Sequence, residues 1–154
     1  MGRVPAPLGR AVSNAAQEGA VAQGDAVILL DTHAWLWLGL EPRRLSAAAI
    51  THAIGTGGLA IASISLWETA LLITAGRLLP LGTEEAWLRA LVDRSGVVVK
   101  QTTPAIALLS AHWPADFPRD PADRVIAASA RAEGLPLVTS DARLRRSRLV
   151  ETVW

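Results

Sequence analysis

Four acidic residues stand where a run of apolar residues gives way to a predicted helix, or just inside that helix. They are Asp31, Glu68, Asp123 and Asp141. If the apolar runs are strands of one parallel sheet, these side chains gather at its carboxyl edge. Carboxylates crowded together repel one another unless a cation neutralises them. The pattern therefore predicts a divalent metal site, at which a metal-activated water could hydrolyse a phosphodiester.

The kind of metal follows from the donor atoms that the sequence offers. The chain has 154 residues and no cysteine, which excludes disulfides and thiolate metal sites. The remaining donors are oxygens and the imidazoles of His33, His52 and His112. Oxygen donors favour Mg²⁺, with Mn²⁺ as the alternative, over a structural zinc. We interpret His33 mainly as a helix-start residue, although it follows Asp31 directly.

Each acid also has a purely structural interpretation. Asp31 and Asp141 each suit a helix N-cap or a turn, because a carboxylate accepts hydrogen bonds from free helix N–H groups. Ser65 and Glu68 have the spacing of a capping box, with serine at the N-cap and glutamate at the third helical position. That geometry would still point Glu68 back toward the end of the preceding strand.

Asp120 and Asp123 form a pair in which the two roles are expected to divide. Asp120 precedes Pro121 and so suits an N-cap followed by proline at the first helical position. Asp123 then lies in the first turn, where the helix dipole favours an anion. We assign Asp120 mainly to capping and Asp123 to the site, although the two could share the work. Four acids at one sheet edge are hard to explain as unrelated caps.

The elements that would position these acids follow from short apolar runs that alternate with helical patterns. Residues 27–30 form a continuous apolar run, typical of a central strand covered on both faces. Further strands are expected at 59–63, 97–99, 135–139 and, at an edge, 150–153. Helices are expected at 33–40, 46–54, 65–75, 104–112 and 120–133, with one more after Thr83 and a basic turn after Asp141. The alternation predicts one α/β domain whose parallel sheet is flanked by helices.

The N-terminal residues and the most apolar stretch of the sequence indicate whether the protein is associated with a membrane. Residues 1–25 have few large apolar groups, which predicts a flexible leader, with a short helix at 11–22, before a domain spanning 26–154. Residues 58–76 are nearly long enough to cross a bilayer, but they contain Glu68 and fit a strand followed by a helix better. With no apolar signal segment at the N-terminus, we expect a cytoplasmic protein without a membrane partner.

The formal net charge is +1, so overall charge does not indicate a nucleic-acid binder, but the distribution of cations is uneven. An arginine cluster in the last quarter comprises Arg131, Arg143, Arg145, Arg146 and Arg148. Near an acidic site it could hold a phosphate backbone. Taken alone, it also fits a solvated helix face.

Four blocks of sequence resemble the motifs of PIN-domain toxins of the VapC type, in the same order and spacing. The blocks are DTHAWLW at 31–37, SISLWE at 63–68 followed by GRL at 76–78, DPADRVIAA at 120–128, and LVTSD at 137–141. The resemblance covers about 27–153. It implies a PIN-like fold of about five parallel strands and a magnesium-dependent endoribonuclease belonging to a toxin–antitoxin pair.

The resemblance also implies roles for particular residues and partners. The acidic positions of such toxins, which bind metal and catalyse RNA cleavage, fall on Asp31, Glu68, Asp123 and Asp141. Thr139 and Ser140 match the polar residues beside the fourth acid and would orient ligands or water, with Asp120 in a supporting position. The implied partners are a small VapB-type antitoxin that blocks the site and a second copy of the chain in a homodimer.

Trp35 and Trp37 lie in a short predicted helix that is apolar all round and must be covered by other protein. We hypothesise that they receive the antitoxin or the second protomer, because aromatic side chains often anchor interfaces. Two other functions remain open on the residues alone. One is a non-cleaving module that holds RNA or a partner protein on the same scaffold, and the other is a phosphatase or DNA nuclease with a similar acidic site.

Overall fold

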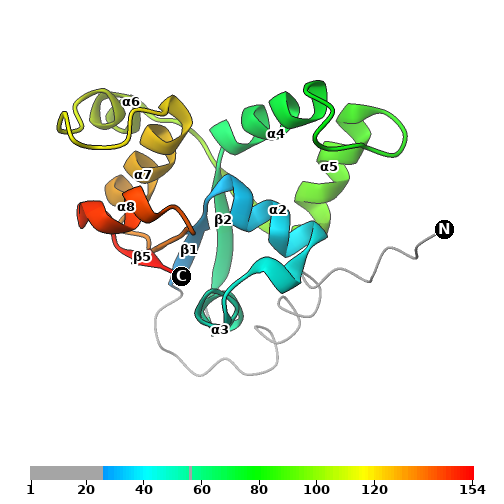
Figure 1. Ribbon diagram of the computed structural model, residues 1–154, viewed down its shortest axis with the longest axis horizontal. Helices are drawn as coiled ribbons and strands as arrows, with labels where there is room; N and C mark the ends of the chain where they lie inside the picture. Colours follow the sequence, from blue (N-terminus) through cyan, green and yellow to red (C-terminus); the bar gives the residue numbers. More distant parts are fainter. Residues whose placement is uncertain (1–25, 56) are drawn as a thin grey trace.

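The computed structural model describes residues 26–55 and 57–154; the predicted leader at 1–25, with its helix at 11–22, lies outside them. The described chain forms an α/β domain around a sheet of five parallel strands (Figure 1). The strands are β1 (Val27–Leu30), β2 (Gly58–Ala62), β3 (Val97–Lys100), β4 (Leu137–Val138) and β5 (Thr152–Val153). Their spatial order is β3-β2-β1-β4-β5, which confirms the predicted fold and places β5 at an edge.

The order of the strands determines which parts of the chain meet at the site. β1 lies between β2 and β4, with Leu30 in register with Ile61 on one side and Val138 on the other. Because all three strands run in the same direction, their carboxyl ends share one edge of the sheet. The segments that follow Leu30, Ala62 and Val138 therefore begin beside one another, as the sequence predicted.

Helices cover both faces of the sheet (Figure 1). They are α2 (Thr32–Leu40), η1 (Pro42–Arg44, a 3-10 helix), α3 (Ala47–Gly55), α4 (Ile64–Thr74), α5 (Glu84–Ser95), α6 (Pro104–Ala111), α7 (Pro121–Glu133) and α8 (Ala142–Ser147). Ile28 and Leu30 pack into one core with α2, α3 and α5, whereas Leu29 packs into the other with α6, α7 and α8. Burial on both faces explains why β1 is a continuous apolar run.

Most predicted helix boundaries are confirmed by their caps. The side-chain oxygens of Ser46 and Thr83 accept hydrogen bonds from the backbone N–H groups of Ala49 and Ala86, at 3.1 and 3.3 Å. The prediction of a capping box at Ser65 is wrong. α4 begins at Ile64, so Ser65 lies in its first turn, fully buried. Ser65 contacts α2 instead of capping its own helix.

The prediction that Trp35 faces a partner is also wrong. Its side chain is completely buried, and its Nε1–H donates a hydrogen bond of 2.9 Å to the hydroxyl of Ser95 on α5. The protein's own core covers most of α2, which is why this helix can be apolar all round. Trp37 remains half-buried. Residues 58–76 form β2, α4 and the turn that follows, and no helix in the described ranges is long and apolar enough to span a bilayer.

Candidate metal and active site

The four predicted acids meet at one cavity of about 520 Å³ at the carboxyl edge of the sheet. We call it the acidic cavity. Its lining residues are Asp31, Thr32, His33, Trp37, Arg44, Glu68, Asp120, Asp123, Ile126, Ser140, Asp141 and Arg143. They come from four separate segments of the chain, so the convergence that the sequence predicted is confirmed.

Asp31 immediately precedes α2, and its side chain is buried. Its Oδ1 accepts a hydrogen bond of 2.6 Å from the backbone N–H of Ala34, so it is an N-cap as well as a cavity residue. Burial raises its pKa above the ordinary value, although hydrogen bonds from Thr139 and Ala34 act in the opposite direction. The Thr139 hydroxyl also accepts a hydrogen bond of 3.1 Å from the backbone N–H of Asp141. Thr139 thereby ties two of the acids together.

Glu68 reaches the cavity from the second turn of α4. Its Oε2 accepts a short hydrogen bond from the hydroxyl of Thr32, which also lies 2.9 Å from the hydroxyl of Ser65. Burial raises the pKa of Glu68, and the negative charges of Asp120 and Asp31 raise it further, against the effect of Thr32. Thr32 was missed as a site residue, although it adjoins Asp31 in the sequence and is buried beside it.

Asp120 caps α7 as predicted, and it also lines the acidic cavity beside Asp123. Oδ1 of Asp120 accepts hydrogen bonds from the backbone N–H groups of Ala122 and Asp123, at 2.9 and 3.1 Å, and so caps α7. Asp123 stands in the first turn with its side chain 24% exposed. Burial and the negative charges of Asp120, Asp141 and Glu68 raise its pKa to about 7. Burial is the largest cause of this shift, and repulsion from the three neighbouring acids adds to it.

Asp141 differs from the other three because Arg143 holds it ionised. Its Oδ1 accepts from the backbone N–H of Arg143 at 2.7 Å, and its Oδ2 accepts from Nη2 of the same arginine at 3.0 Å. Burial raises the pKa of Asp141, but these hydrogen bonds and the positive charge together lower it below the ordinary value. Arg143 also lies 3.7 Å from Asp123, so its guanidinium sits between two acids of the site.

The donor set fits a hard divalent cation. Within 26–55 and 57–154, no three acidic or histidine side chains already stand as a metal-binding group. Each carboxylate is held by a neighbour: Asp31 by its cap, Glu68 by Thr32, and Asp123 and Asp141 by Arg143. Magnesium keeps several of its waters and needs only one or two direct carboxylates, so it does not require a closed cage. Repulsion from neighbouring acids adds to the effect of burial in raising the pKa of Asp123, and a bound cation would relieve that repulsion.

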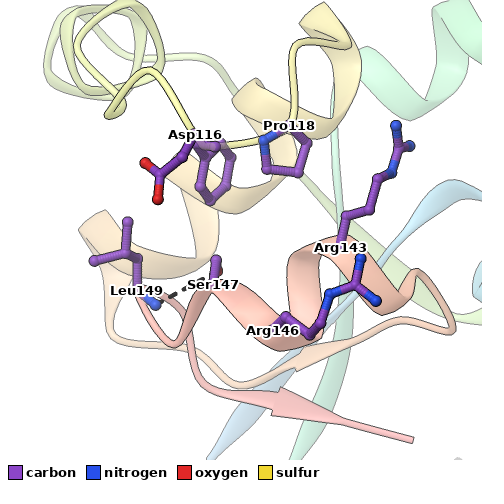
Figure 2. Close-up of a pocket in the computed structure, with 7 residues that line it drawn as sticks. Asp116, Pro118, Arg143, Arg146, Ser147 and Leu149 are labelled. Atoms are coloured by element: carbon purple, nitrogen blue, oxygen red, sulfur yellow. Dashed lines mark hydrogen bonds between the residues drawn. The ribbon is translucent and has the colours of Figure 1, made fainter.

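A second cavity of about 390 Å³, which we call the α8 cavity, shares Arg143 with the acidic cavity. Figure 2 shows Arg143 and Arg146 projecting from α8, with Pro118 and Asp116 on the loop across from them. The predicted arginine cluster is therefore divided. Arg145 lies exposed outside both cavities, and the Arg131 guanidinium lies 5.4 Å from the centroid of the Trp113 ring.

The match to a family model and the similarity to a known relative point to the same protein family. Residues 28–148 match the PIN domain family. The chain is 40% identical over 129 residues to "Ribonuclease VapC22" of Mycobacterium tuberculosis, an alignment that covers 82% of this chain and 98% of that protein.

Two solved structures show the same fold. VapBC2 from Rickettsia felis, bound to a DNA fragment from its promoter, superposes with a TM-score of 0.58 at 16% identity, covering 82% of this chain and 96% of that one. VapBC-1 from nontypeable Haemophilus influenzae gives the same TM-score at 18% identity, with the same coverage.

Proposed function

This chain belongs to the PIN domain family, and we propose that it is a magnesium-dependent endoribonuclease acting as the toxin of a toxin–antitoxin pair. The observation that carries the proposal is the convergence of Asp31, Glu68, Asp123 and Asp141, from segments far apart in the sequence, on one cavity. The relative that is 40% identical is itself named a ribonuclease and aligns over nearly its whole length, which supports RNA as the substrate.

We assign the four acids as the groups that would hold Mg²⁺, directly or through water, with Mn²⁺ as a possible replacement. When bound, the metal would lower the pKa of a water molecule and polarise a phosphoryl oxygen. The chain's own groups orient the acids. Thr32 fixes the carboxylate of Glu68, and Thr139 fixes that of Asp31 while its oxygen holds the backbone of Asp141. Ser140 lines the cavity and could position water.

Cations near the site would hold the RNA backbone. Arg143 and Arg146 belong to one face of α8 and line the α8 cavity, which adjoins the acidic cavity through Arg143. A strand whose scissile phosphate lies in the acidic cavity would pass these arginines, and each phosphate that pairs with arginine releases condensed counterions. Because Arg143 is already paired with Asp141, we assign more of this role to Arg146.

We further propose a VapB-type antitoxin as the protein partner and a homodimer as the assembly. Two of the solved structures with the same fold are those of VapBC2 and VapBC-1, which supports an antitoxin partner. Trp35 is buried and cannot serve as the anchor that the sequence suggested. Exposed apolar side chains on α4 and on the loop after it are better placed to meet a protein. They are Trp67, Leu71, Leu79 and Leu81, with 54, 47, 82 and 82% of their surface exposed.

The proposed activity is tested by incubating the purified protein with a single-stranded RNA pool, single-stranded DNA or a phosphomonoester, each with Mg²⁺ or EDTA. Cleavage of RNA alone, and only with the metal, is the expected result. Cleavage of DNA or of the monoester would favour the nuclease or phosphatase alternative. Mg²⁺ binding by calorimetry without cleavage of any RNA would favour the non-cleaving module. Co-purification with the product of a short neighbouring reading frame would test the antitoxin.

A further inference from the structure

One cation in the wall of the acidic cavity was not singled out by the sequence. Arg44 lines this cavity from η1, and its guanidinium carbon lies 4.5 Å from the centroid of the Trp37 ring. Trp37 in turn contacts His33 and Trp154, with ring centroids 5.9 and 5.7 Å away. We call Trp37, His33 and Trp154 the aromatic support. It joins α2 to Trp154, and its Trp37 ring contacts the guanidinium of Arg44.

The two arginines of the acidic cavity are engaged differently. Arg143 pairs with Asp141 and Asp123, so much of its charge serves the acids themselves. Within the described residues, the ion pair of Arg44 is with Glu41 at 3.8 Å, and both side chains are more than half exposed. Such an exposed pair contributes little to stability. Arg44 therefore brings to the cavity wall a positive charge that the acids of the site do not use.

RNA entering this cavity meets five carboxylates, those of Asp31, Glu68, Asp120, Asp123 and Asp141. A metal bound by these acids would relieve repulsion at the scissile phosphate, whereas the adjacent phosphates of the strand would need a cation that belongs to the protein. Arginine suits that role because its planar fork can make two parallel hydrogen bonds to one phosphate. Stacking on an indole ring holds the fork in place before the ligand arrives, which lowers the entropy lost on binding.

We propose that Arg44, held on Trp37, binds a phosphate of the RNA strand next to the one that is cleaved. The proposal rests on the proposed function and adds a substrate-binding residue to it. The RNA strand would then meet two cations besides any bound metal, Arg44 on η1 and Arg146 on α8.

The chain supplies a matched control. Arg43 precedes Arg44 in the same three-residue helix and is likewise exposed, but it does not line the acidic cavity. Arg43→Ala and Arg44→Ala therefore remove the same charge from nearly the same place in the sequence. A general effect of net charge on RNA binding would appear in both variants, whereas a phosphate contact in the cavity would appear in one.

The experiment measures binding of a fluorescein-labelled, random-sequence 20-nucleotide RNA by anisotropy over a series of KCl concentrations. Ca²⁺ replaces Mg²⁺ so that an oxygen-ligand cation is present while cleavage is slowed. We expect Arg44→Ala to weaken binding about tenfold. It should also reduce the slope of log K against log salt by about 0.7, the value for one phosphate contact on a single strand. Arg43→Ala should change affinity less than about threefold and leave the slope unchanged.

Two further variants separate the charge of Arg44 from its packing against Trp37. Arg44→Lys keeps the charge and should retain the wild-type slope, whereas Arg44→Met keeps apolar contact with the indole and should behave like Arg44→Ala. In Mg²⁺, the KM for RNA cleavage should rise in Arg44→Ala with little change in kcat. These comparisons remain decisive if Arg44→Ala itself folds poorly.

The failures of the two proposals are distinguishable. If the wild-type protein cleaves RNA but Arg44→Met binds with wild-type affinity and slope, Arg44 is a packing residue and the inference is wrong. The same conclusion follows if Arg43→Ala and Arg44→Ala bind alike. If the wild-type protein does not cleave RNA with Mg²⁺ under any condition, the proposed function itself has failed.

Discussion

The raised pKa of Asp123 leads to a quantitative prediction about metal binding. Burial and three neighbouring acids raise this pKa from 3.8 to about 7, so at pH 6 about 0.9 of the carboxyl groups carry a proton. A bound Mg²⁺ requires the ionised form, and its binding should therefore release most of one proton from Asp123 at pH 6 and far less at pH 8. Protons given up by Asp31 and Glu68, whose pKa values are also raised, add to this release. Below pH 7 the ionisation of Asp123 alone should raise the affinity about tenfold per pH unit, and this contribution should level off above pH 7.

The assay is titration calorimetry with Mg²⁺ in pairs of buffers that differ in ionisation enthalpy, because the difference between the observed heats gives the protons released. Asp123→Asn is the test variant, and Asp93→Asn, on the exposed face of α5, is the matched control. Asp123→Asn should release about one proton fewer than the wild type at pH 6, while the control should release as many as the wild type. Equal release by both variants would show that Asp123 is not the group that titrates.

The raised pKa of Asp123 also determines how the stability of the metal-free protein should change with pH. The folded state holds the proton of Asp123 more tightly than the unfolded state does. The contribution of this proton to the free energy of unfolding is therefore fully present below about pH 4 and is lost as the pH rises toward 7. The Tm of Asp123→Asn should therefore exceed that of the wild type by more at pH 8 than at pH 5. An equal or opposite difference would refute the assignment of the raised pKa.

Four further substitutions test other parts of the structure. Asp31→Asn should reduce RNA cleavage more than about 100-fold. Its Tm should stay within a few degrees of the wild type, because the amide oxygen still caps α2. Unchanged cleavage would show that Asp31 is not a residue of the active site. Trp35→Ala should cost about 3–5 kcal/mol of unfolding free energy in chemical denaturation, since it leaves a buried cavity and removes the hydrogen bond to Ser95. A loss below about 1 kcal/mol would contradict the burial of Trp35. Arg146→Ala should weaken RNA binding several-fold more than Arg145→Ala, which lies on the same helix outside the α8 cavity; equal effects would point to net charge alone. Trp67→Ala should weaken antitoxin binding about 30-fold with little change in Tm, and unchanged affinity in a pull-down titration would place the interface elsewhere.

The parts that the sequence predicted correctly depend on local patterns. The apolar run at 27–30 indicated a strand covered on both faces, and the Asp120–Pro121 pair marked the start of α7. Each of these signals concerns a few adjacent residues and the backbone that they build. Once the strands were known to be parallel, their carboxyl ends had to share an edge, and the convergence of the acids followed.

The parts that were missed depend on contacts between distant residues. Ser65 has the spacing of a capping box, but the tertiary contact with Thr32 buries it inside the first turn of α4. The apolar pattern of α2 could not tell Trp35 from Trp37, because only the packing of α5, about sixty residues later, covers one and not the other. The aromatic support of Arg44 was equally hidden, since Trp154 reaches Trp37 from the far end of the chain.

The structural and the functional interpretations of the acids turn out to be compatible, because one carboxylate can serve both. Asp31 caps α2 through Oδ1, and Asp141 caps α8, while both line the acidic cavity. Their helices therefore begin at the cavity, where free N–H groups and the positive end of each dipole offset part of the repulsion among the acids. This arrangement lets the fold tolerate a cluster of carboxylates before any cation binds. It also explains why asparagine is the informative replacement at position 31: the amide keeps the cap and removes only the charge, so a loss of cleavage cannot be attributed to a loss of the helix.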